Sequence, residues 1–347
     1  MKYKITGLII TVVMICMLTG CEEKAKSYIE QGMDALEQYD YGTAAGLFDS
    51  ALSNDENPQQ AYRGKGMALL GLARYSEAEQ MFLNALSKSN GTVGEMEYDI
   101  SYYLAVAQAK AGKYDEAFDT YSAIIAMNEK AQDAYYLRGK ISLSRGDKGA
   151  ALDDFDMSII LAPTDYDGYI RICKDLTGSG YESEGKAYIQ RAMNTDYKKS
   201  DYQMGVFHYY MGEYEDARSC FEKSHETKTT KDLIVHMGKT YEALGDYNYA
   251  VSLYNEYLAS HSDEAELYLQ LGRNKMTQGD YEGAVSAFEA GTATNNVEYI
   301  QSLKFNRIVA YEYMLDFKMA AKLMEEYVRE YPEDEDAERE YRFLQTR

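Results

Sequence analysis

A small residue followed four positions later by an aromatic residue recurs along most of the chain. Residues four apart lie on the same face of an α-helix, so each pair predicts a helix with a small-and-aromatic stripe. The small residues, here called anchors, are spaced by 32 to 39 residues. The anchors are Ala44, Ala78, Ala117, Ala151, Gly185, Ala217, Ala250, Ala284 and Ala320. The aromatic residues that follow seven of them are Phe48, Phe82, Tyr121, Phe155, Phe221, Tyr254 and Phe288. A period of this length predicts paired helices that stack as repeats.

A glycine precedes most anchors by about twelve residues, at a position that the periodicity places inside an earlier helix. Glycine within a helix costs about 1 kcal/mol relative to alanine, so its repeated use indicates a close approach between two helices. Segments such as Gly245-Asp246-Tyr247 lie between the first-helix glycine and the anchor. They predict a turn, because glycine accepts the left-handed conformation that ends a helix. The six glycines are Gly32, Gly66, Gly139, Gly205, Gly238 and Gly272. Each repeat is therefore predicted to contain two helices joined by a short turn.

This combination of a first-helix glycine, a Gly-x-Tyr-x-x-Ala turn and a later aromatic residue resembles the tetratricopeptide repeat family. The resemblance covers residues 25–336 and implies an all-α fold, a right-handed α-solenoid of about nine helix-turn-helix repeats. It also implies that side chains of the first helices line a groove that receives peptides. Residues 337–347 are expected to form a capping helix, because the last repeat would otherwise leave an apolar face uncovered.

Several repeats depart from this pattern. Repeat three has Ala105 and repeat nine has Ile308 where the other repeats have the first-helix glycine. Repeat five has Gly185 as its anchor, and its turn at residues 177–181 is one residue out of step. A longer loop is expected at residues 89–94. We therefore expect local irregularity in repeat five and at this loop.

Residues 1–20 have the features of an export signal. Lys2 and Lys4 precede an apolar run at residues 5–17 that is too short to span a membrane comfortably. The run is followed by Leu18-Thr19-Gly20-Cys21, which resembles the bacterial lipobox. The alternatives are an uncleaved anchor helix, or an ordinary secretory signal with a cysteine at this position by chance.

The lipobox resemblance implies cleavage before Cys21 and a lipid on its sulfur. Residues 21–24 would then be a short tether between the lipid and the first repeat. We expect an extracytoplasmic protein that is lipid-anchored to the cell membrane, or to the outer membrane if the cell is Gram-negative. The lipid on Cys21 is the predicted membrane contact.

Composition narrows the range of functions. The chain has only 3 prolines and 46% hydrophobic residues, as expected for an ordered, largely helical protein. Its formal net charge of −21 repels phosphate groups, so no nucleic-acid partner is expected. Of the 4 cysteines, Cys16 leaves with the signal and Cys21 is acylated. Cys173 and Cys220 are expected to be buried, unpaired residues on different helices of neighbouring hairpins.

Reactive chemistry is not indicated. The histidines have neither a second histidine nor a cysteine pair at metal-binding spacing, and the sequence has no phosphate-binding loop. The four histidines are His208, His225, His236 and His261. We therefore expect no enzyme activity, no catalytic residue, no metal and no cofactor.

Two rows of side chains fall on the expected groove. One first-helix position is aromatic in four repeats, at Tyr102, Tyr136, Tyr202 and Phe305. The position one turn later is cationic in four repeats, at Lys140, Lys174, Lys239 and Arg273. Such a surface would accept an extended or helical segment bearing carboxylates. The alternative is that the cations pair with acids of the same register, namely Asp133, Asp167, Asp232 and Glu266. The two asparagines of the family's carboxylate clamp are not present, so recognition of a terminal carboxylate is not implied.

These observations predict a membrane-tethered scaffold or adaptor for a protein or peptide partner in the cell envelope. The alternative is a ligand-capture lipoprotein that uses its tyrosines on glycans or other small solutes, since aromatic rings suit sugars. This second function is less favoured because the 35 tyrosines are spread evenly over the repeats and mostly serve packing.

Overall fold

The computed structural model describes residues 26–89, 91, 93–332 and 334–347. Every regular element within these residues is an α-helix, nineteen helices with no strand, which confirms the predicted all-α fold. No described helix combines the length and apolar character needed to cross a bilayer. The predicted signal and Cys21 lie outside the described residues. The chain divides into two compact units, which meet in sequence at Leu161 and Ala162.

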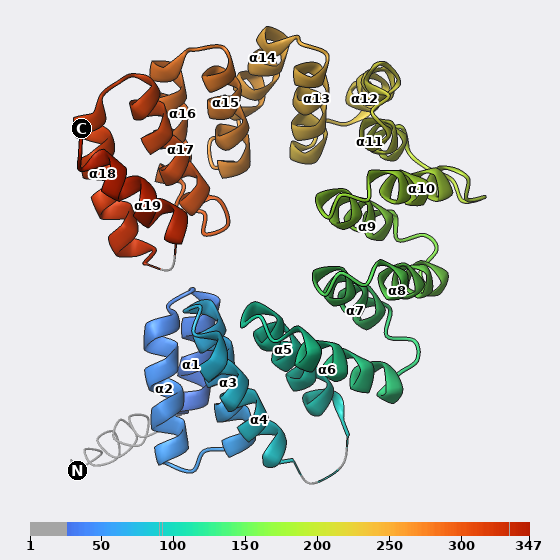
Figure 1. Cartoon of the computed structure of the whole chain (residues 1–347), viewed down its shortest axis with the longest axis vertical. Coiled ribbons are helices and arrows are strands. Elements are labelled where there is room, and N and C mark those ends of the chain that lie inside the picture. The colour runs from blue at the N-terminus through green and yellow to red at the C-terminus, as the bar shows by residue number, and fades with distance from the viewer. Residues whose placement is uncertain (1–25, 90, 92, 333) are drawn as a thin grey trace, which may run out of the picture. The chain divides into compact units, whose positions relative to one another are not determined.

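Unit 1 contains four helical hairpins, whose consecutive helices lie side by side (Figure 1). Their helices are α1 (Tyr28–Glu37), α2 (Tyr41–Ser53), α3 (Pro58–Gly71), α4 (Tyr75–Ser87), α5 (Glu95–Lys110), α6 (Tyr114–Met127), α7 (Gln132–Ser144) and α8 (Lys148–Leu161). The expected longer loop falls between α4 and α5, where Asn90 and Thr92 lie outside the described residues.

Unit 2 contains five hairpins and a final helix. Its helices are α9 (Tyr166–Gly178), α10 (Glu182–Met193), α11 (Asp201–Met211), α12 (Tyr214–Thr227), α13 (Lys231–Ala243), α14 (Tyr247–Leu258), α15 (Ala265–Thr277), α16 (Tyr281–Ala293), α17 (Ile300–Tyr313), α18 (Phe317–Glu330) and α19 (Glu335–Leu344). The capping helix α19 begins two residues before the expected start at residue 337, because the Asp334 side chain accepts a hydrogen bond from the backbone N–H of Ala337 and caps it.

In six of the nine hairpins the first helix packs against the second through a glycine that faces an aromatic ring. A Cβ atom on Gly32 or Gly139 would lie 2.8 Å from the ring of Phe48 or Phe155. On Gly66 it would lie 2.6 Å from Phe82. Gly205, Gly238 and Gly272 face Phe221, Tyr254 and Phe288 in the same way. The close helix approach predicted from the glycines is therefore a contact in which the ring occupies the space of a missing side chain.

The three repeats without this glycine have other residue pairs at the same two positions. Repeat three has Ala105 and Tyr121, repeat five has Cys173 and Ile189, and repeat nine has Ile308 and Met324. In repeats five and nine the larger first-helix residue is matched by an aliphatic partner, and all six side chains are at most 3% exposed. These three repeats therefore close the same contact with other pairs of buried side chains.

The turn of every hairpin places one residue in the left-handed region, five positions before the anchor, with φ between 57° and 85°. Six of these residues are glycines, including Gly180 with φ 85°. In the other three turns, the left-handed position is occupied by Tyr39, Ala73 and Leu315. Gly180 and the start of α10 keep the normal spacing to Gly185, so the turn of repeat five is regular. The expected irregularity of this turn is wrong.

Gly185 also has a structural reason of its own. A Cβ atom at this position would lie 2.9 Å from the carbonyl oxygen of Cys173, so α9 and α10 approach through backbone atoms here. Cys173 on α9 is buried as predicted, whereas Cys220 on α12 is only half-buried.

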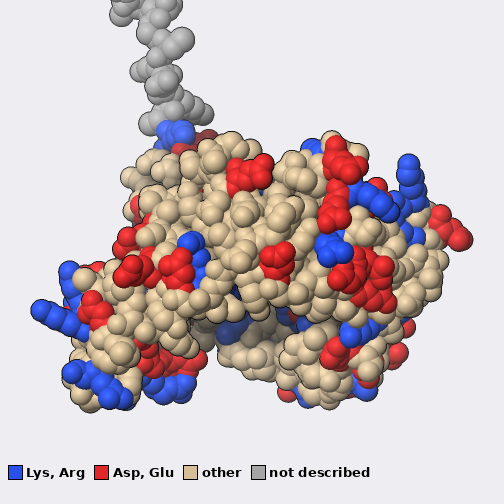
Figure 2. Space-filling view, turned by 90° about the horizontal axis from the view of Figure 1, so that it is seen from above, with Lys and Arg blue, Asp and Glu red and all other residues tan. Residues whose placement is uncertain are grey.

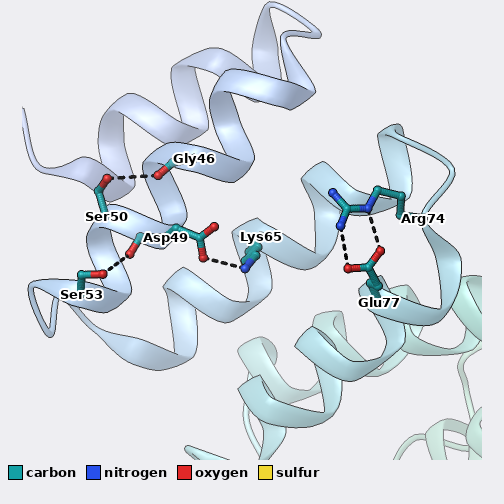
Figure 3. Close-up of polar contacts among 7 residues, drawn as sticks. All are labelled: Gly46, Asp49, Ser50, Ser53, Lys65, Arg74 and Glu77. Atoms are coloured by element: carbon teal, nitrogen blue, oxygen red, sulfur yellow. Dashed lines mark hydrogen bonds and ion pairs between the residues drawn. The ribbon is translucent and has the colours of Figure 1, made fainter.

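Ion pairs join neighbouring helices on the surface and in the interior. The Lys65 Nζ of α3 lies 2.6 Å from the Asp49 carboxylate of α2 (Figure 3). In the interior of unit 1, the Arg138 guanidinium of α7 donates two hydrogen bonds to Asp154 of α8, at 2.9 and 2.7 Å. The outer surface in Figure 2 carries acidic and basic residues in small mixed groups between wide uncharged areas.

The final helix covers the end of unit 2. Ala337 and Leu344 of α19 join Ile308 and Met324 in one buried apolar cluster. Glu312 at the end of α17 faces α19, and its Oε1 has no hydrogen-bond partner. Burial, together with the neighbouring Glu340 of α19, raises the pKa of Glu312 to about 7.

Replacing Gly66 by Ala should destabilise unit 1 by about 1–3 kcal/mol, because the new methyl group overlaps the fully buried Phe82 ring. Gly46 provides a matched control, since it lies inside α2 and no atom lies within 4 Å of its Cβ position. Gly46→Ala should stabilise the unit by up to about 1 kcal/mol through helix propensity. Urea unfolding followed by circular dichroism measures both changes. A Gly66→Ala variant as stable as the Gly46→Ala variant would contradict the packing argument.

Candidate functional site

The predicted groove residues are divided between the two units, and each unit is described by itself. In unit 1, Tyr136 is only 8% exposed and its ring packs against Phe155 at a centroid distance of 5.9 Å. Tyr102 lies 5.2 Å from Tyr98 and 6.3 Å from the buried ring of Tyr121. The prediction that Tyr136 forms a groove floor is wrong, because its ring fills the core between α7 and α8. Lys140 lies exposed on α7.

In unit 2, the remaining predicted residues lie on the first helices of the hairpins. We call this surface the first-helix face, defined by Lys174 on α9, Tyr202 on α11, Lys239 on α13, Arg273 on α15 and Phe305 on α17. The side chains recur there because repeats of about 34 residues return the same register position to the same side of the stack.

A cavity of about 250 Å³ opens on the first-helix face between α9, α11 and α13. Its walls are largely aromatic and aliphatic, and polar groups lie among them, as is usual for ligand pockets. The lining residues include Tyr166, Ile170, Lys174, Tyr202, Tyr210 and His236. The Lys174 ammonium lies 5.5 Å from the centre of the Tyr210 ring, within the range of a cation–π contact.

Tyr202 and His236 form the centre of the face. Their rings are nearly perpendicular, with centroids 5.7 Å apart, and the Tyr202 hydroxyl lies 3.3 Å from Nδ1 of His236. Nδ1 also lies 2.8 Å from the backbone oxygen of Asp232, which can only accept, so Nδ1 carries the proton. Burial lowers the pKa of His236, and Lys239 and Lys174 lower it further. His236 is therefore a neutral, fixed group at pH 7.

Lys239 is a half-buried cation without a counterion. Burial lowers its pKa, and the charges of Lys174 and Arg273 act in the same direction. Glu266 and Glu242 raise the pKa of Lys239, but both carboxylates have other partners. Glu266 lies 3.5 Å from Lys231, and Glu242 accepts hydrogen bonds from Tyr254 and Asn274 at 2.9 and 3.0 Å.

Three cations of unit 2 are thus left without ion pairs. Within the part of the chain that the structure describes, no carboxylate lies within 4.0 Å of Lys174, Lys239 or Arg273. The alternative that they pair with Asp167, Asp232 and Glu266 is wrong for this unit. Each acid precedes its cation by seven residues, which is about 10.5 Å along a helix and too far for direct contact.

Arg273 marks a second opening of the face. It lines a cavity of about 440 Å³ together with Phe305, Tyr327, Asp334 and other residues of α17 to α19. Asp334 is already engaged, because it accepts a hydrogen bond from the Tyr327 hydroxyl at 2.9 Å. The first-helix face therefore carries cavities near both ends, with Lys239 between them in sequence.

Sequence reasoning missed Tyr210 and the central position of His236. The signal for Tyr210 is its position eight residues after Tyr202 on the same helix, which places both rings on one face. The role of His236 follows from its contact with Tyr202 across two repeats, and a single-repeat pattern does not encode it.

One group of potential metal ligands occurs among the described residues, formed by His208, Glu213 and Asp216. The Nδ1 of His208 lies 2.7 Å from Glu213, five residues later and across the hairpin turn. Lys275 and Asp280 form the same contact at 2.6 Å in repeat eight. The His208 contact is therefore a turn-spanning pair of the repeat, and it does not indicate a metal.

Replacing Lys239 by Met should raise the thermal unfolding midpoint by a few degrees, because it removes a half-buried ammonium that no carboxylate neutralises. Lys231→Met on the same helix is the control and should lower the midpoint, since it leaves Glu266 without its partner. Both differences should shrink in 1 M salt. A Lys239→Met variant less stable than the wild type would show that the charge is neutralised in the folded chain.

Comparison with known proteins gives matches to the fold. No curated protein sequence matches the chain. A tetratricopeptide repeat protein from Parabacteroides merdae has 17% identity over 72% of this chain and 99% of its own length, with a TM-score of 0.47. MamA from Desulfovibrio magneticus has 18% identity over 49% of this chain and 94% of its own, with a TM-score of 0.42. YrrB, described as a TPR protein with an unusual peptide-binding site, has 21% identity over 50% of this chain and 88% of its own length, with a TM-score of 0.39.

The sequence profile of the tetratricopeptide repeat matches residues 29–91, 65–128, 102–166 and 236–297, which is more than half of the chain. The segment from 167 to 235 lies between these matches, and it contains repeat five, the poorest by sequence. The structure nevertheless forms the hairpins α9–α10 and α11–α12 there. The chain therefore belongs to the tetratricopeptide repeat family.

Proposed function

We propose that this protein is a scaffold that binds a protein or peptide partner on the first-helix face of unit 2. We propose further that a lipid on Cys21 holds it at the extracytoplasmic side of a membrane. The fold supports the first part, since stacked tetratricopeptide hairpins present side chains of many repeats on one continuous face.

The observation that carries the proposal is the set of three unneutralised cations beside aromatic rings. Lys174, Lys239 and Arg273 repel one another in a chain whose net charge is −21, although carboxylates are abundant. An incoming carboxylate removes this repulsion and gains charge-assisted hydrogen bonds. The rings of Tyr202 and Tyr210 supply apolar contact area at the same place. The proposed partner segment therefore carries carboxylates.

The chemistry of the face fits binding better than catalysis. Ammonium, guanidinium and phenol groups recognise charge and ring faces, and His236 is held by its contact with the Asp232 backbone. Among the described residues of this face, no nucleophile is paired with a base that would activate it. We therefore assign it a recognition role.

The lipid tether is supported by the lipobox-like segment at Cys21. Helix α1 begins at Tyr28, so at most about 25 Å of extended chain separates it from the lipidated residue. Two or more acyl chains would hold such a protein firmly, because each buried methylene contributes about 0.8 kcal/mol. The first repeat would then lie next to the bilayer.

A second candidate function is the capture of a glycan or small solute. The 250 Å³ cavity favours it, because Tyr166, Tyr202 and Tyr210 all contribute to its walls. A glycan array probed with the purified chain separates the two functions, since the scaffold proposal predicts no glycan that competes with the protein partner.

The binding face is tested by a photo-crosslinking residue at Tyr210 in cells. Changing Lys174, Lys239 and Arg273 together to Glu should reduce the captured partner by at least about tenfold, through loss of three charge-assisted contacts. The control changes Lys223, Lys318 and Lys322 to Glu, which alters the net charge equally on exposed positions of α12 and α18. Equal capture by the two variants would refute the proposed face.

The tether is tested by Cys21→Ser. This variant should move from the membrane fraction to the soluble fraction and should lose incorporation of a labelled fatty acid, because the acylated sulfur is gone. Cys173→Ser controls for loss of a thiol and should remain in the membrane fraction. Membrane retention of Cys21→Ser would show that another segment anchors the chain.

A further inference from the structure

We propose that the occupant of the first-helix face is an α-helix of the partner, with an apolar stripe flanked by acidic residues on one side and basic residues on the other. This inference rests on the proposed function and specifies its partner. It follows from the order in which acidic, apolar and basic side chains occur across the face.

Three hairpins of unit 2 repeat the same order along their first helix. An acid is followed three residues later by an aliphatic residue and seven residues later by a cation. The three sets are Asp167, Ile170 and Lys174 on α9; Asp232, Val235 and Lys239 on α13; and Glu266, Leu269 and Arg273 on α15. On α11 the middle position is Tyr202, but Lys199 just before the helix and Val206 within it replace the acid and the cation, so both charged rows are interrupted there. The face therefore carries an acidic row and a basic row. Of the middle positions between them, Val235 and Leu269 are buried in the core, whereas Ile170 and Tyr202 are partly exposed and line the cavity.

The acidic and basic rows face the same space. Asp167 and Lys174 line the same cavity. Asp232, Asp167 and Glu266 all add to the effect of burial in raising the pKa of Tyr202. Lys239 and Lys174 add to the effect of burial in lowering the pKa of His236, whose Nδ1 lies 3.3 Å from the Tyr202 hydroxyl. Acids of one row and cations of the other thus both lie near the Tyr202 and His236 pair.

The separation of the rows matches the width of a helix. Seven residues correspond to about 10.5 Å along each first helix, and an α-helix with its side chains is about 10–12 Å across. On each first helix the acid and the cation are too far apart for a direct ion pair, although Glu266 of the acidic row still raises the pKa of Lys239 on the neighbouring first helix. A helix lying between the rows would bring its basic flank to the acidic row and its acidic flank to the basic row.

A helix also fits the middle positions. Side chains point in all directions around the axis of a partner helix. Its apolar stripe can therefore enter the cavity beside Ile170 and Tyr202 while its two flanks reach the charged rows. An extended strand has only two side-chain directions, so it would leave either the cavity or one charged row without a contact. First helices about 10 Å apart place α9 and α15 about 30 Å apart, the length of a twenty-residue helix.

The order of the rows also sets the direction of the bound helix. Turning such a helix end for end exchanges its two flanks, which would place like charges together on both rows. The first-helix face therefore distinguishes the two directions, in addition to recognising composition.

The test uses three synthetic helical peptides of about twenty residues with one leucine stripe and different flanks. One peptide has a glutamate flank and a lysine flank, one has glutamate on both flanks, and one has lysine on both. Fluorescence anisotropy with the purified full chain should show the two-signed peptide binding at least about tenfold more tightly than either other peptide at low salt.

Two variants test the rows separately. Lys174→Glu, Lys239→Glu and Arg273→Glu together make both rows acidic, so the peptide with two lysine flanks should become the tightest ligand. Adding Asp167→Lys, Asp232→Lys and Glu266→Lys reverses the rows, and the two-signed peptide should then bind in the opposite direction. A benzophenone at the peptide N-terminus, located by mass spectrometry, should crosslink near α9 in one protein and near α15 in the other.

The outcomes separate this inference from the proposed function. If the peptide with two glutamate flanks binds as tightly as the two-signed peptide, or if the two-signed peptide does not bind, the two-row helix model is overturned. The proposed function depends instead on partner capture in cells and on its loss in the variant with Glu at 174, 239 and 273. Circular dichroism melting of each variant shows that the hairpins are folded.

Discussion

The fold depends on one contact, in which the ring of a second helix occupies the space that a first-helix side chain would fill. This contact sets the distance between the two helices of a hairpin, and the left-handed residue of the turn fixes where the second helix begins. Because each repeat contacts mainly its neighbours, repeating this contact and this turn along the sequence is enough to build a long array. Repeats five and nine have other buried pairs at these two positions, Cys173 with Ile189 and Ile308 with Met324.

The binding face follows from this regularity. A constant period returns each register position to the same side of the stack, so single charges on separate helices become rows. The seven-residue separation keeps Asp232 and Lys239 apart on one helix, and Glu266 is drawn away by Lys231 at 3.5 Å. The cost of leaving Lys239 half-buried and unpaired is tolerated by a fold whose stability comes from the packed hairpins. We propose that the partner supplies the carboxylates that neutralise the cations of this face.

Much of this architecture could be predicted from the sequence, because the fold is local and repetitive. The anchors, the first-helix glycines and the turn glycines each have one structural role. The structure shows the anchors buried, the first-helix glycines against aromatic rings and the turn glycines in the left-handed conformation. Tyr136 was misassigned because its register position is open in some repeats and covered in others, and periodicity does not record which. The turn of repeat five was misjudged from Tyr181, whereas Gly180 decides its geometry. The cavity between α9 and α13 combines residues of three repeats, and the contact between Tyr202 and His236 depends on how those helices are stacked.

The carboxyl groups at the end of unit 2 have a consequence for the surroundings in which the protein works. Glu312 and Glu340 face each other between α17 and α19, and the first is neutral only below about pH 7. The pKa of Glu312 in the folded chain lies above the unfolded value of 4.5, so its contribution to stability is fully present below about pH 4.5. That contribution declines as the pH rises to about 7. Above that range two negative groups oppose the docking of α19, the helix that shields Ile308 and Met324. Rising pH therefore weakens the packing of α19 on the end of unit 2, because Glu312 becomes charged where it is half-buried beside Glu340.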